Sequence, residues 1–119
     1  MPEIQEVIEN YVAAWNSNDS QARTTTMNGV LAPDCIYLDS HLPDPTVGKE
    51  SHCLFIDRFK DKFPDLSLHL TKAVDSHHDH FRFQWQMLKG DGDVFIKGCF
   101  VGEVNEQQQI TKLVGFVDS

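Results

Sequence analysis

The stretch LAPDCIYLDSHLPDPTVG, residues 31–48, indicates both a fold and a site. It opens with the helix breaker Pro33, continues as the apolar run 35–38, and ends that run with one acid, Asp39. Two prolines and Gly48 follow. This order predicts a strand, an acid at the mouth of the strand, and a kinked loop that leads into a helix. An acid held between water and apolar walls is a common proton-transfer group.

Two helices are predicted before this stretch. In residues 3–16 apolar side chains recur with a period of 3.6, and acids occupy the first turn, where the helix dipole favours them. The turn formers of residues 16–20 end this helix. A second helix is expected over residues 20–31, with Pro33 closing it.

A third helix is expected over residues 49–62. Its apolar face comprises Leu54, Phe55, Ile56, Phe59 and Phe63. Its charged residues are expected to face water; they are Asp57, Arg58, Lys60 and Asp61. The sequence Phe63-Pro64-Asp65 stops the helix.

From residue 66 onward the apolar period changes from 3.6 to 2, which is typical of strands. Strands are predicted over residues 66–74, 81–88, 94–105 and 110–117, with turns at 75–79, 90–93 and 106–109. Helices followed by an antiparallel meander predict an α+β fold with the helices packed on one face of a curved sheet. The length of 119 residues predicts a single domain, residues 1–119.

Composition excludes several classes of function. The formal net charge of −8 and the absence of a basic stripe argue against binding to nucleic acid or to an anionic membrane. No apolar run approaches the roughly 20 residues of a membrane span, and no signal peptide is recognised, so a cytoplasmic protein is expected. The three cysteines include no C-x-x-C pair and are expected to be buried, reduced thiols.

Several motifs together resemble a known superfamily. They are YVAAWNSND in the first helix, APDCIYLD in the first strand, a Gly-led helix ending in FPD, and the closing segment QQQITKLVGFVD. In this order they resemble the nuclear-transport-factor-2-like superfamily, in particular its branch of SnoaL-like polyketide cyclases and ketosteroid isomerases. The resemblance implies a cystatin-like cone, in which a strongly bent antiparallel sheet wraps around three helices and a deep pocket. It also implies a homodimer formed through the outer face of the sheet.

The ketosteroid-isomerase resemblance implies roles for individual residues. Tyr11 matches a tyrosine that donates a hydrogen bond to an oxyanion, and Asp39 matches the aspartate that removes a proton next to a carbonyl. The place of a second, protonated aspartate falls on Phe100, whose ring cannot donate. Loss of one such donor typically costs about 10²–10³ in rate, which argues against steroid isomerisation itself.

Each of these residues also has a plain structural interpretation. Asp39 could simply cap the following loop through backbone N–H groups, and Tyr11 could be a core residue on the apolar stripe of its helix. His41 lies two residues beyond Asp39 and could relay protons with it, or could be an ordinary loop histidine.

The pocket walls are expected to be aromatic: Trp15, Phe55, Phe59 and Phe100. The histidines at 77, 78 and 80 do not share one face of a strand, so a solvated turn is favoured over a metal site. No organic cofactor is implied, because residues 90–92 form a hairpin turn rather than a phosphate-binding loop.

The face of the strand that carries Arg82 is open. Residues 81, 83, 85 and 87 form one aromatic face, and Arg82 lies on the opposite, polar face. If the aromatic face lines a dimer interface, Arg82 becomes a ligand-binding residue of the pocket.

The sequence therefore favours a pocket for a small organic molecule. One hypothesis is a cofactor-independent isomerase or cyclase with Asp39 as general base and Tyr11 or His41 as hydrogen-bond donor. The alternative is a non-catalytic module of the same fold that binds a ligand or dimerises.

Overall fold

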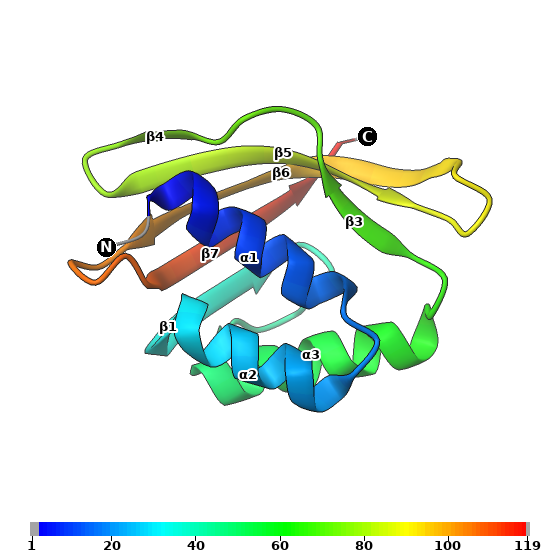
Figure 1. Ribbon diagram of the computed structural model, residues 1–119, viewed down its shortest axis with the longest axis horizontal. Helices are drawn as coiled ribbons and strands as arrows, with labels where there is room; N and C mark the ends of the chain where they lie inside the picture. Colours follow the sequence, from blue (N-terminus) through cyan, green and yellow to red (C-terminus); the bar gives the residue numbers. More distant parts are fainter. Residues whose placement is uncertain (1–2, 119) are drawn as a thin grey trace.

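Three helices lie against one face of a curved seven-stranded sheet in the computed structural model, which describes residues 3–118 (Figure 1). The helices are α1 (Ile4–Asn16), α2 (Ser20–Val30) and α3 (Lys49–Lys62). The strands are β1 (Leu31–Asp39), β2 (Thr46–Val47), β3 (Ser67–Leu70), β4 (Asp75–His77), β5 (His80–Leu88), β6 (Val94–Val104) and β7 (Ile110–Val117). The predicted α+β class is confirmed, and the bounds of α3 and β7 are those expected from the sequence periods.

The sheet is mixed rather than wholly antiparallel, and it is open. Its order is β2-β1-β7-β6-β5-β3, with β4 paired to β5. The meander β5-β6-β7 is antiparallel as predicted, but β1 pairs with β7 in parallel, with Tyr37 opposite Leu113 and Asp39 opposite Gly115. The parallel pairing is possible because α3 and the meander form a long crossover between the two strands.

Two local predictions were wrong. Pro33 does not close α2, because the helix ends at Val30 and β1 begins directly after it at Leu31. Pro33 lies within the strand, where a register shift between Leu31 and Ile36 accommodates it. Residues 75–77 form β4 instead of a turn. The turn that follows contains only His78 and Asp79, both with positive φ (51° and 62°), which is the geometry that tight hairpins require.

The third helix is rotated relative to the face expected from its sequence. Lys60 is buried and its Nζ donates to the Leu66 carbonyl at 3.3 Å, so the long stem packs in the core while the charge finds a backbone acceptor. Leu54 is exposed instead.

No helix of residues 3–118 is long and apolar enough to cross a membrane.

Aromatic rings of other residues pack against three glycines on the inward face of β6 and β7. A Cβ atom added at Gly98 would lie 2.8 Å from the Trp85 ring, one at Gly102 would lie 2.5 Å from Phe81, and one at Gly115 would lie 2.5 Å from Phe100. The rings therefore occupy the space that side chains would take on an ordinary strand, and they lie close against the sheet. This packing leaves room between the sheet and the helices.

We expect Gly98→Ala to destabilise the fold by more than about 2 kcal/mol, because a Cβ there would lie 1.9 Å from the Phe116 carbonyl oxygen of the paired strand. Gly29→Ala is the matched control. Apart from its chain neighbours and the adjacent backbone of α2, no atom lies within 4 Å of its Cβ position, and helix propensity predicts stabilisation by about 0.5–1 kcal/mol. Urea unfolding measures both changes, and equal effects of the two substitutions would contradict the packing described.

Candidate functional site

A cavity of about 510 Å³ lies between the inward face of the sheet and helices α1 and α3. This size is typical of sites for small organic molecules. The residues that line it are Trp15, Tyr37, Asp39, His41, Phe55, Arg58, Phe59, Lys62, Phe63, Leu68, Trp85, Met87, Phe95, Ile96, Phe100 and Val117. The structure thus brings together the four expected aromatic walls with Asp39 and His41.

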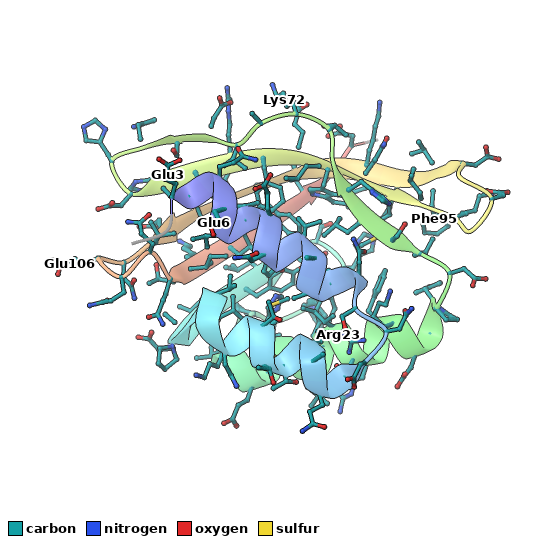
Figure 2. All side chains as sticks on the ribbon, viewed as in Figure 1. Glu3, Glu6, Arg23, Lys72, Phe95 and Glu106 are labelled. Atoms are coloured by element: carbon teal, nitrogen blue, oxygen red, sulfur yellow. The ribbon has the colours of Figure 1, made fainter. Side chains whose placement is uncertain are left out.

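The walls are held by contacts between aromatic rings. Trp15 packs edge-on against Phe59, with ring centroids 5.3 Å apart, and against Phe55 at 6.2 Å. On the sheet side, the centroids of Trp85 and Phe100 are 5.6 Å apart. Phe95 on β6 also borders the cavity and remains 48% exposed, so its ring lies at the edge rather than inside (Figure 2).

Asp39 is the last residue of β1 and the only acid among the described residues that line the cavity. Its side chain is 17% exposed. The Tyr37 hydroxyl donates to Oδ2 at 2.6 Å, and the His41 backbone N–H donates to Oδ1 at 2.8 Å. An ionised carboxylate has about four acceptor positions, so these two bonds leave others available to a ligand.

His41 lies beside Asp39, as the sequence suggested, but mostly in solvent. Its Nδ1 is 3.2 Å from Asp39 Oδ1, and its side chain is 67% exposed. The pair has the geometry in which a carboxylate orients an imidazole through Nδ1, with Nε2 left for other partners.

Tyr11 does not line the cavity. It is fully buried, and its hydroxyl lies 2.7 Å from His52 Nε2. Burial raises the pKa of Tyr11 above its ordinary value, so the hydroxyl stays protonated. The structure therefore places this tyrosine in the core, with its hydrogen-bonding capacity directed to a histidine.

Sequence reasoning did not single out His52 or Tyr37. His52 is 1% exposed, its ring lies 4.3 Å from that of Tyr37, and its Nδ1 has no partner among the described residues. Burial lowers its pKa to about 3, so it is neutral at pH 7. The sequence periods could have identified both residues. Tyr37 lies two residues before Asp39 and so shares its face of the strand, and His52 lies one helical turn before Ile56.

Arg82 lies outside the cavity, which corrects its expected role in the pocket. Its strand buries Phe81, Phe83, Trp85 and Met87 and exposes the opposite face. The Arg82 side chain is 70% exposed, and its Nε donates to Asp75 Oδ2 at 3.0 Å. The aromatic face is the inner one because only that face has apolar surface from the helices to cover it.

Among residues 3–118 no group of His, Cys, Asp and Glu side chains is arranged to hold a metal ion.

The fold has many relatives among solved structures. A candidate isomerase of the SnoaL-like family from Agrobacterium tumefaciens is 28% identical with a TM-score of 0.88, and the match covers 96% of both chains. A hypothetical protein with a ketosteroid isomerase-like fold from Catenulispora acidiphila, solved in complex with trimethylamine, is 17% identical with a TM-score of 0.74; the match covers 93% of this chain and 84% of that one.

A candidate polyketide cyclase from Sinorhizobium meliloti is 14% identical with a TM-score of 0.73, and the match covers 98% of this chain and 95% of that one. Other neighbours have NTF2-like and cystatin-like folds. No protein-family model and no curated protein sequence matches the chain. The structural neighbours confirm the fold class and the resemblance that the sequence motifs indicated.

The buried His52 makes stability depend on pH. Below its ordinary pKa of 6.5 the unfolded chain binds a proton at His52 that the folded protein does not bind until about pH 3, so acid favours unfolding in that window. One such proton contributes a slope of about 1.4 kcal/mol per pH unit. Urea unfolding from pH 4 to 7 should therefore show a flatter dependence for His52→Gln, whereas the exposed-site control His77→Gln should keep the wild-type slope. Identical slopes for wild type and His52→Gln would contradict a neutral, buried His52.

Proposed function

We propose that the cavity binds a small organic molecule and that Asp39 removes a proton from it, as in cofactor-independent isomerases and cyclases. The observation that supports this most is the place of Asp39, a single carboxylate at the wall of an aromatic cavity. A general base in such a position contributes typically about 10²–10⁴ to a rate. The neighbours described as SnoaL-like and as a candidate polyketide cyclase support the same reaction class.

The carboxylate of Asp39 is oriented for this role by its own strand. Tyr37 and Asp39 both lie on the inward face of β1, and the Tyr37 hydroxyl fixes Oδ2 of Asp39 through the 2.6 Å hydrogen bond. Burial raises the pKa of Tyr37 well above its usual range, so Tyr37 remains a donor throughout the neutral range. The positioned oxygen accepts the proton from the ligand carbon, and the ligand keeps the electron pair as an enolate or its equivalent.

A binding function without chemistry is the second candidate. Both oxygens of Asp39 already accept hydrogen bonds, one of them from a backbone N–H, which is also the pattern of an acid that stabilises a loop. The Catenulispora acidiphila neighbour holds a small molecule, and this supports ligand binding for the present chain under either candidate.

Nitrobenzisoxazole tests the general base. It is a flat aromatic molecule that opens when a base removes its ring C–H proton; the N–O bond breaks and a coloured cyanophenolate is released. We expect Asp39→Asn to lower the rate of opening by about 10²–10⁴ relative to wild type. Asp44→Asn removes an exposed acid of the same loop that does not line the cavity, and should leave the rate unchanged.

Equal rates for wild type and Asp39→Asn would exclude Asp39 as a general base and leave the binding function. Native mass spectrometry of the purified protein then addresses that function directly, because a bound small molecule appears as a mass difference that denaturation removes.

The outer face of the sheet supports a homodimer as the assembled form. Phe116 is 52% exposed on β7, Val101 36% on β6 and Ile36 37% on β1. The strand order places these three strands side by side, so their outward apolar side chains form one patch. Exposed aromatic and aliphatic side chains of this kind are enriched in the cores of protein interfaces.

Phe116→Lys should convert the dimer to a monomer in sedimentation experiments, because a charge within the patch would be buried without a partner. Leu54→Lys is the control. Leu54 is 48% exposed on α3, away from the sheet, and its replacement should leave the dimer intact. A wild-type protein that sediments as a monomer would contradict the proposed assembly.

A further inference from the structure

Two cations border the cavity from one helix. Arg58 and Lys62 are four residues apart in α3 and therefore lie on the same side of it, beside Phe55 and Phe59. No ion pair joins either of them to another residue of the described range 3–118, whereas Arg23 on the neighbouring helix is paired with Asp57. The Nζ atom of Lys62 lies 5.5 Å from the centre of the Phe63 ring, at the edge of the cavity.

The charge of the side chains that line the cavity is opposite in sign to the net charge of the whole protein. The chain carries 18 acidic and 10 basic residues, with a formal net charge of −8. Among the described residues that line the cavity, Asp39 is the only acid, whereas Arg58 and Lys62 are both basic. An acidic surface repels anions, so a cationic border on this apolar cavity has the effect of selecting them.

We infer that the cavity takes an organic anion: a molecule with a flat apolar body that packs among the aromatic walls and a carboxylate or similar group that Arg58 and Lys62 bind. Arg58 can bind a carboxylate through two parallel N–H bonds, and Lys62 supplies a second charge. This inference rests on the binding part of the proposed function and does not require that Asp39 act as a base. Where Asp39 does act, the same positive charge favours the oxyanion that forms, in a cavity where Phe100 offers no donor.

Two fluorescent dyes of nearly identical shape test the inference. Anilinonaphthalenesulfonate carries one negative charge, and phenylnaphthylamine is the same ring system without the sulfonate. Both tryptophans of the chain line the cavity, so energy transfer from Trp15 and Trp85 reports dye bound there. We expect wild type to bind the anionic dye about tenfold more tightly than the neutral one, with a preference that falls as salt is added.

The double variant Arg58→Gln/Lys62→Gln should lose this preference and keep its affinity for the neutral dye. Lys72→Gln is the control for loss of a positive charge elsewhere on the surface, because Lys72 is exposed and lies beyond the sheet on the side opposite α3 (Figure 2). It should leave both affinities within about twofold of wild type, since exposed charges far from the dye are screened.

Equal affinity of wild type for the two dyes would overturn the inference and leave the cavity as a site for neutral molecules. A double variant that binds both dyes more weakly by the same factor would also overturn it. Arg58 and Lys62 would then maintain the shape of the cavity rather than bind the anionic group. Failure of both dyes to bind would remove the binding function itself. The ring-opening assay reports on Asp39 separately, so the two failures are distinguishable.

Discussion

The packing of aromatic rings onto inward glycines is the constraint on which the site depends. Gly98, Gly102 and Gly115 interrupt the row of inward side chains on β6 and β7, and the rings of Trp85, Phe81 and Phe100 occupy the space at these positions. A ring that lies close against the sheet covers a large area of backbone and projects little toward the helices. The helices therefore meet the sheet around its edges, and a cavity of about 510 Å³ remains where the core of an ordinary α+β protein would be filled.

The placement of the acid follows from the same arrangement. Residues 35, 37 and 39 share the inward face of β1, so the strand that seals the core with Tyr37 also presents Asp39 to the cavity. Parallel pairing with β7 sets Asp39 beside Gly115, which has no side chain to cover the carboxylate. The acid thus remains partly open toward the ring of Phe100, the residue that packs on Gly115.

Sequence reasoning was sufficient where one local pattern determined the outcome. The 3.6 period and Pro64 defined α3, and the period of two defined β7. It was insufficient where the outcome depended on distant pairing. Nothing in residues 31–39 encodes a parallel contact with residues 110–117, and Arg82 could be assigned to a face only once the helices covered the other.

The site was predictable to a similar extent. Asp39 and the aromatic walls followed from a strand-end acid, apolar stripes and a family resemblance, and the structure places them around one cavity. The site role of Tyr11 was predicted from the resemblance alone, and in this chain the Tyr11 hydroxyl is hydrogen-bonded to His52. Lys60 and Arg58 were both expected to face water. Lys60 is buried instead, because a lysine stem can pack in the core and reach a carbonyl, a contact that charge patterning along a helix does not reveal. Arg58 borders the cavity.

An NMR titration with phenylnaphthylamine tests most directly whether Asp39 belongs to a ligand-binding cavity. The side-chain carboxyl carbon of Asp39 and the indole N–H groups of Trp15 and Trp85 should shift together and give one dissociation constant, while Phe116 on the outer face stays unchanged. Saturable shifts of the indoles with no change at Asp39, or shifts confined to the outer face, would contradict an acid that lies at the wall of an occupied cavity.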